Sequence, residues 1–129
     1  MIVADTDVLI DFLRGKGGGA DQVELELERG SLVTTVITRF ELLAGARSDH
    51  QRSTVLVLLE GLVTLPLDEE SADRAADVRR SLQAEGLDIG MADSLIAGIT
   101  LERGAILLTR NRRHFDRVDG LVLSPAAME

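Results

Sequence analysis

Acidic side chains in this 129-residue chain recur where predicted strands end and predicted helices begin. Asp5 directly follows a short apolar run, Glu41 lies one turn into a predicted helix, and Asp93 lies at the beginning of another. Asn111 and Asp116 follow the end of a later apolar run. Carboxylates that share a small volume repel one another, and a bound cation offsets that repulsion. Such a site favours phosphoryl transfer, because a metal ion lowers the pKa of an attacking water and neutralises charge on the phosphorane-like oxygens.

The composition restricts the metal that this site would hold. The chain has no Cys and only two His, far apart in sequence, so the ligands must be oxygen or His. Mg²⁺ or Mn²⁺ bound by carboxylates is therefore the default. A net charge of −8 argues against a broad basic face for nucleic acid, and three Phe without Trp or Tyr argue against base stacking on an aromatic platform.

Strands and helices alternate along the chain, and they would position these acids. The expected strands are residues 2–4, 32–37, 62–67, 105–108 and 121–123, and the expected helices are residues 7–14, 21–29, 38–43, 53–60, 68–85 and 92–103. Pro66 suits an edge strand, and residues 15–19 predict a flexible connection. The alternation predicts one α/β domain over residues 1–129, a three-layer α/β/α fold with a parallel sheet of roughly five strands. In such folds function lies at the carboxyl ends of the strands, at a topological switch point.

Each acid also has a purely structural explanation. Asp5 is suited to cap the first helix, and Asp93 is an acid favoured in a first helical turn. Thr38 and Glu41 have the spacing of a capping box, and Asp116 suits a solvated surface. A shared site is favoured because unrelated caps have no reason to lie at one end of the sheet.

Four segments in order resemble the PIN domain, and within it the VapC toxin ribonucleases of bacterial toxin–antitoxin pairs. These segments are residues 3–10, 38–45, 92–97 and 108–115, which together span nearly the whole chain. The resemblance implies a Mg²⁺- or Mn²⁺-dependent endoribonuclease. Asp5 and Asp93 would match the family's principal metal ligands, and Glu41 the acid that completes the site or orients water.

The same resemblance implies a homodimer, neutralised by a small VapB-like antitoxin, that cuts structured RNAs such as tRNA or ribosomal RNA. The chain departs from the family after the fourth strand, where many members carry an acid. Here Asn111 and His114 occupy that segment, with Asp116 slightly beyond, which leaves the number of metals open. Asp7 stands where many relatives have Asn, and we expect it, with Thr109, to orient the site.

A basic segment beside the site would contact RNA phosphate. Its arginines are Arg110, Arg112, Arg113 and Arg117. Because Arg is suited to bidentate phosphate contacts, we predict local clamping of RNA that weakens with salt. Arg14, Lys16 and Arg39 are further candidates, and the alternative for the basic segment is a solvated loop.

Two other functions compete with the nuclease. In a haloacid-dehalogenase-like phosphatase Asp5 would be the nucleophile and Asp7 the general acid, but the sole Lys, Lys16, comes too early for that family. A catalytically impaired RNA- or partner-binding module would explain the missing fourth acid. The apolar run at residues 55–59 suits either a core helix or one that covers a partner. With no signal peptide or membrane-length apolar run, we expect an intracellular, cytoplasmic protein without membrane contact.

Overall fold

The structure, a computed structural model, describes residues 1–125, and the last four residues of the predicted domain 1–129 lie outside this range. Its strands are β1 (Ile2–Ala4), β2 (Leu32–Thr35), β3 (Val63–Leu65), β4 (Ile106–Leu108) and β5 (Val122–Leu123). Its helices are α1 (Thr6–Arg14), α2 (Gly18–Arg29), α3 (Val36–Gly45), α4 (Asp49–Glu60), α5 (Glu69–Ala84), α6 (Met91–Glu102) and α7 (Arg112–Phe115). No helix in this described part is long and apolar enough to cross a membrane.

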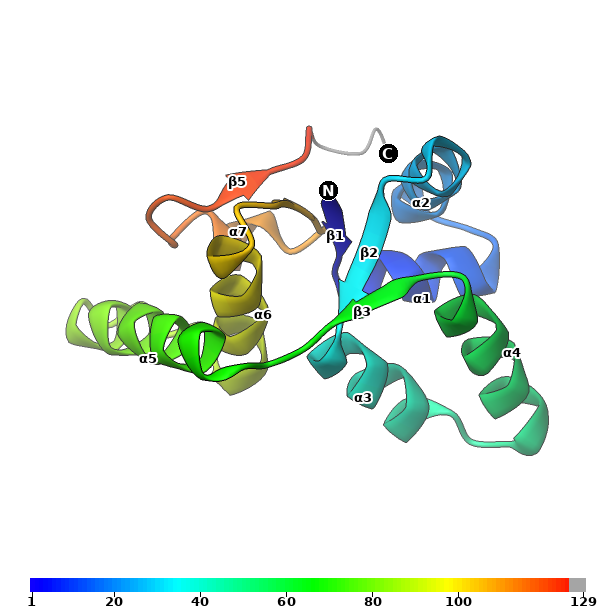
Figure 1. The fold of residues 1–129 in the computed structure, drawn as a ribbon, viewed down its shortest axis with the longest axis horizontal. Helices are drawn as coiled ribbons and strands as arrows, with labels where there is room; N and C mark the ends of the chain where they lie inside the picture. Colours follow the sequence, from blue (N-terminus) through cyan, green and yellow to red (C-terminus); the bar gives the residue numbers. More distant parts are fainter. Residues whose placement is uncertain (126–129) are drawn as a thin grey trace.

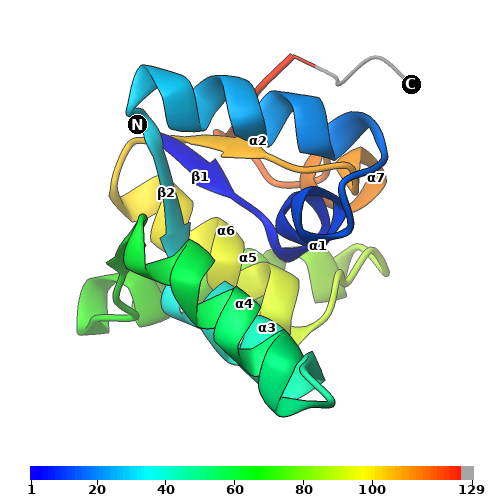
Figure 2. The same ribbon diagram turned by 90° about the vertical axis from the view of Figure 1, so that its right-hand side faces the viewer.

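The five strands form one parallel sheet in the order β3-β2-β1-β4-β5 (Figure 1). Helices cover both of its faces, with α5 and α6 on one side and α1, α2 and α4 on the other, as Figures 1 and 2 together show. The predicted three-layer α/β/α fold with a parallel five-stranded sheet is therefore confirmed. β3, the strand next to Pro66, lies at an edge as expected.

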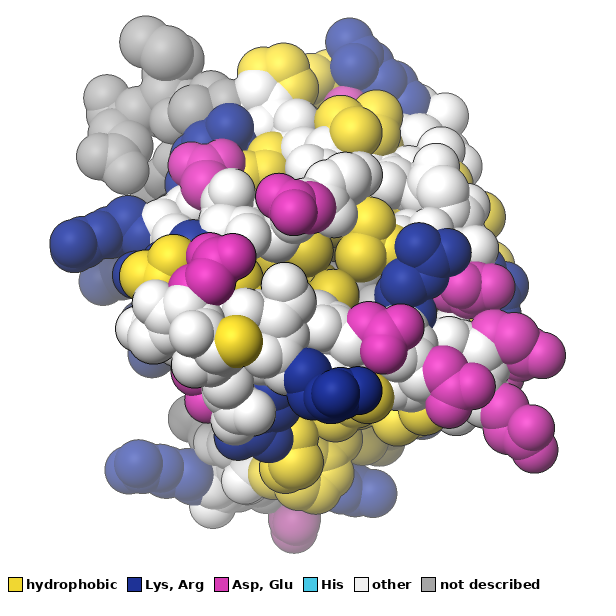
Figure 3. Space-filling view, turned by 90° about the vertical axis from the view of Figure 1, so that its left-hand side faces the viewer, with side chains coloured by type: hydrophobic (Ala, Val, Ile, Leu, Met, Phe, Trp, Pro, Cys, Tyr) yellow, Lys and Arg dark blue, Asp and Glu magenta, His cyan; other side chains and the backbone are white. Residues whose placement is uncertain are grey.

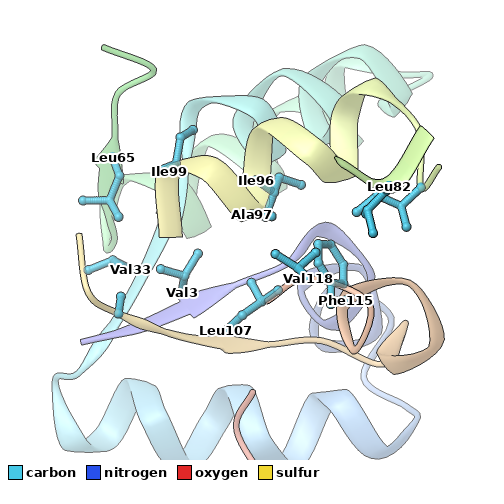
Figure 4. Close-up of a cluster of buried hydrophobic side chains, with 12 residues drawn as sticks. Val3, Val33, Leu65, Leu82, Ile96, Ala97, Ile99, Leu107, Phe115 and Val118 are labelled. Carbon is cyan, nitrogen blue, oxygen red and sulfur yellow. The ribbon is translucent and has the colours of Figure 1, made fainter. Parts of the chain in front are cut away.

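The sheet separates two apolar cores, because successive strand residues point to opposite faces. Val3 packs with the α6 residues Ile96 and Ile99 and with Phe115 of α7 (Figure 4). The next residue, Ala4, belongs to the core formed with α1, α2 and α4. Each face of the sheet is thus covered by a layer of helices packed on its own apolar core.

α5 and α6 pack in close contact. Gly98 of α6 lies against α5, where a Cβ atom would come within 2.6 Å of the Cβ atom of Ala75. Only glycine permits this close approach of the two helices, because it has no Cβ atom. Asp93 lies in the first turn of α6, so the packing of this helix positions it.

Several predicted boundaries were wrong by up to a turn. β2 ends at Thr35 and α3 begins at Val36, whereas the sequence predicted a strand over 32–37 and a helix from Thr38. The reason is that the hydroxyl of Thr35 caps α3 by accepting from the backbone N–H of Thr38. α4 likewise begins earlier than predicted, after the N-cap residue Ser48.

Candidate active site

The predicted switch point lies between β1 and β4. β1 pairs with β2 on one side and with β4 on the other, so the order of connection reverses there. The backbone N–H of Asp5 donates to the carbonyl of Leu108 over 2.9 Å, which ties the ends of the two strands together. In open α/β sheets this crevice is where ligands bind.

Asp5 is the most buried acid of the crevice, with 5% of its surface exposed. One carboxylate oxygen accepts from the backbone N–H of Thr6 at 2.8 Å, and the other accepts from the hydroxyl of Thr109 at 2.7 Å. Burial above all, together with the charges of Asp7 and Asp93, raises the pKa of Asp5 to about 7, although the two hydrogen bonds oppose the rise. Hydrogen bonds thus hold the Asp5 carboxylate in place, but acidic neighbours leave its negative charge uncompensated, as expected for a cation ligand.

Asp7 holds the loop that follows β4. Its carboxylate accepts from the backbone N–H of Arg110 at 3.2 Å and lies 3.4 Å from the hydroxyl of Thr109. A hydroxyl has one hydrogen, and the shorter contact of Thr109 is with Asp5. The same hydroxyl accepts from the backbone N–H of Asn111 at 3.0 Å. Burial raises the pKa of Asp7 above its ordinary value. Thr109 therefore links the end of β1 to the loop after β4.

Glu41 faces the start of α1 instead of the start of its own helix. The hydroxyl of Thr6 donates to Glu41 over 2.6 Å and lies 3.0 Å from the hydroxyl of Thr38. Because Thr35 caps α3, the capping-box explanation of Glu41 is wrong. Glu41 is half-buried and joined to Asp5 through the neighbouring residue Thr6. No local sequence pattern indicates this role of Thr6, because the hydrogen bond joins residues 35 positions apart.

Asp93 is held by the two polar side chains that replace the expected fourth acid. The side-chain amide of Asn111 donates to Asp93 Oδ2 over 3.2 Å, and His114 Nδ1 lies 2.9 Å from the same oxygen. The short helix α7, absent from the sequence prediction, turns His114 toward Asp93. Asp116 follows α7 and is exposed, and its side chain makes no hydrogen bond or ion pair within residues 1–125. The structure brings Asn111 to the site and leaves Asp116 outside this network.

Three of the four arginines of the basic segment are engaged within the fold. Arg110 Nε lies 2.7 Å from Asp11 Oδ2. Arg112 donates to the carbonyl of Ser124 over 2.7 Å, and Arg117 to the carbonyl of Leu87 over 3.2 Å. Arg113 is exposed and has no such partner in the described part of the chain. On the face shown in Figure 3, basic and acidic side chains are interspersed and form no continuous basic patch.

In the part of the chain that the structure describes, the donor set available to a magnesium-type ion is a pair of carboxylates and not a cluster of three. Within residues 1–125, no three His, Asp or Glu side chains converge closely enough to hold a metal among them. Mg²⁺, however, usually keeps several waters and takes only one or two carboxylates. Asp5 and Asp93 are close enough for the charge of Asp93 to raise the pKa of Asp5. Two carboxylates completed by water would therefore be the donor set for such an ion within the described residues.

A groove of about 350 Å³ runs between α1, α3 and α4 beside the site. Its walls include the apolar side chains of Ile10, Leu13, Leu42 and Val55. Glu41 and Arg14 also line it, so the groove leads to the candidate active site.

Comparisons with known proteins show the family to which the chain belongs. The family model described as "PIN domain" matches residues 2–121. The tRNA(fMet)-specific endonuclease VapC of Shigella flexneri is 31% identical over 121 residues, which cover 91% of each chain. Ribonuclease VapC10 of Mycobacterium tuberculosis is 34% identical over 94% of this chain and 90% of its own. The solved structure of VapBC-1 from nontypeable Haemophilus influenzae superposes with a TM-score of 0.81 at 26% identity, over 96% of this chain and 97% of that one.

Proposed function

From the premise that this chain belongs to the PIN domain family, with VapC ribonucleases among its relatives, we propose that it is a divalent-metal-dependent endoribonuclease and the toxin of a toxin–antitoxin pair. The observation that carries the proposal is the position of Asp5. Its buried carboxylate lies at the switch point of the sheet, has a pKa raised to about 7, and is near a second acid, Asp93. Burial of a carboxylate without a neighbouring positive charge destabilises the fold, and a bound cation would offset that cost.

Asp5 and Asp93 would hold Mg²⁺ or Mn²⁺, which when bound would supply an attacking water of lowered pKa and offset the charge of the phosphodiester. Thr109 fixes one Asp5 oxygen, and Asn111 with His114 fixes one Asp93 oxygen, so each carboxylate keeps a defined direction. In this proposal Glu41, held by Thr6, orients the attacking water and takes up its proton at the carboxylate.

The proposed contact with RNA is local. Arg113 is exposed next to the Asp93 network, and the side chain of Arg110 is 44% exposed although its Nε faces Asp11. These two side chains are better placed to bind phosphate than Arg112 and Arg117, which donate to backbone carbonyls of the fold. A small number of phosphate contacts is compatible with a net charge of −8.

The proposed partners are a VapB-like antitoxin and a second copy of the chain. The groove between α1, α3 and α4 suits an apolar antitoxin segment, because an occupant would reach Glu41 and obstruct the site. Thr54→Arg, at an exposed position in the groove wall, should then prevent copurification with the antitoxin from the neighbouring gene while RNA cleavage persists. Copurification at the wild-type yield would contradict this assignment. The homodimer remains a prediction, to be checked by light scattering.

The test of the proposed function is cleavage of total RNA in Mg²⁺, with mapping of the cut sites. We expect discrete cuts that disappear with EDTA and in Asp5→Asn and Asp93→Asn. Cleavage that survives in both variants would refute the proposal. No cleavage by the wild type, with binding of RNA retained, would favour the catalytically impaired module instead. The phosphatase alternative has no support in the PIN match, and wild-type hydrolysis of p-nitrophenyl phosphate would revive it.

A further inference from the structure

Asp11 is a buried acid on α1 that takes no part in the candidate active site. It lies one turn after Asp7, on the same face of the helix, and 8% of its surface is exposed. Its Oδ2 atom is buried and accepts no hydrogen bond within the described residues. Arg110 Nε lies 2.7 Å from that oxygen, but its N–H direction makes the contact an ion pair without a hydrogen bond. The Arg110 guanidinium is therefore the one charge that balances Asp11 in the described structure.

The turn before α2 closes over this ion pair with backbone alone. A Cβ atom on Gly17 would lie 2.9 Å from Asp11 Oδ2, and one on Gly19 would lie 2.7 Å from the same atom. Gly17 also has a φ of +95°, which disfavours any side chain there. Residues 15–19 were predicted as a flexible connection. Instead, Gly17 and Gly19 pack closely over the Asp11 carboxylate, and Gly18 and Gly19 belong to α2. The Asp11 carboxylate is sealed on this side and faces Arg110 on the other.

Arg110 is consequently held by α1 at two points. Asp7 accepts from its backbone N–H, and Asp11 attracts its guanidinium. The residues on either side of Arg110 contact the candidate metal ligands, since Thr109 donates to Asp5 and Asn111 donates to Asp93. The position of this loop therefore depends on how firmly α1 holds Arg110.

We propose that Asp11 is a positioning residue, which acts through Arg110 to hold the loop after β4 in register with Asp5 and Asp93. The inference rests on the proposed function for its kinetic consequence. Its structural part, that Asp11 and Arg110 act as one unit that fixes this loop, stands on the contacts alone. Misplacement of a catalytic loop by about 1 Å is enough to reduce turnover by ~10²-fold.

The kinetic test is a double-mutant cycle with Asp11→Asn, Arg110→Gln and the double variant. The substrate is a fluorescent RNA oligonucleotide that contains a site mapped in total RNA. We expect each single change to lower kcat by ~10- to 100-fold, and the double variant to be no slower than Arg110→Gln alone, because one unit can be lost only once. KM should change less for Asp11→Asn than for Arg110→Gln. Asp21→Asn, the same change at an exposed position in the first turn of α2, is the matched control and should behave as wild type. A double variant that loses the product of the two single effects would overturn the proposal.

The structural test needs no RNA. Amide hydrogen exchange, followed by NMR, reports the Arg110 N–H that Asp7 accepts and the Asn111 N–H that Thr109 accepts. We expect both amides to exchange at least ~10-fold faster in Asp11→Asn and unchanged in Asp21→Asn. Unchanged exchange in Asp11→Asn would overturn the proposal, whatever the activity. If the wild type cleaves no RNA while these amides respond as expected, the proposed function fails and the positioning role of Asp11 stands.

Discussion

Replacement of Asp5 by Asn should stabilise the metal-free protein while it removes the proposed activity. The carboxylate is 5% exposed, and its pKa is raised from 3.8 to about 7, mainly by burial. A raised pKa in the folded state means that the folded protein binds the proton more tightly than the unfolded chain. The stabilising effect of that proton is complete below about pH 3.8 and is lost as the pH rises to about 7.

The size of this loss follows from the two pKa values. The difference between them corresponds to about 4 kcal/mol of folding free energy above pH 7, and about 2–3 kcal/mol of it is lost between pH 5 and pH 8. Asn has one acceptor oxygen where Asp5 uses two, for Thr6 and for Thr109, and the lost hydrogen bond costs about 1 kcal/mol. Asp5→Asn should therefore gain about 3 kcal/mol at pH 8 and about 1 kcal/mol or less at pH 5.

Urea unfolding in EDTA, followed by far-UV circular dichroism, measures this difference in a chain that has no Trp or Tyr. Asp73→Asn, on the exposed side of α5, is the matched control and should show no such dependence on pH. A gain in Asp5→Asn that is equal at pH 5 and pH 8, or a loss of stability at pH 8, would refute the reasoning. Addition of Mg²⁺ should then stabilise the wild type and leave Asp5→Asn unchanged.

Three further changes test other parts of the structure. Thr109→Val removes the hydroxyl that donates to Asp5, so RNA cleavage should fall by at least ~10-fold while Thr109→Ser keeps most of it; equal activity of the two would contradict the orienting role. Gly98→Ala forces a Cβ atom against Ala75 and should lower the free energy of unfolding by about 1–3 kcal/mol, which an unchanged urea midpoint would disprove. Arg113→Ala, made in the Asp5→Asn background, should weaken RNA binding and reduce its salt slope by about 1, and an identical slope would exclude a phosphate contact at this residue.

The α/β/α layers and the position of the candidate site were predictable from the sequence, because both depend on local patterns. Apolar runs that alternate with amphipathic helices predict a parallel sheet, and the switch-point rule then places Asp5 beside the loop after β4. The structure confirms this sheet, and the short distance from Thr109 to Asp5 follows from the pairing of β1 with β4. The strand–helix pattern and the switch-point rule together were enough to predict this position, without knowledge of the side-chain contacts.

The remaining features depend on specific side-chain contacts that residue type and periodicity do not indicate. Val36 and Ile37 are β-branched and read as strand, but β2 leaves the sheet at Thr35, whose hydroxyl begins α3. Gly17 and Gly19 read as flexible because glycine disfavours helices, whereas their small size lets them pack on Asp11. In both cases the partner lies close in sequence, at Thr38 and at Asp11, but residue type and periodicity do not indicate the contact.

The pairing of β1 with β4 also sets the order in which this protein can become active during its synthesis. β1 emerges first, but its partner strand begins at Ile106, and the loop that orients Asp5 comes after it. A growing chain of about 100 residues already contains all three acids, yet Asp5 then has neither the Leu108 carbonyl nor the Thr109 hydroxyl as a partner. The centre is thus completed only after β4 and the loop that follows it have been synthesised, so a chain proposed to cleave RNA has no complete site while only about its first 100 residues exist.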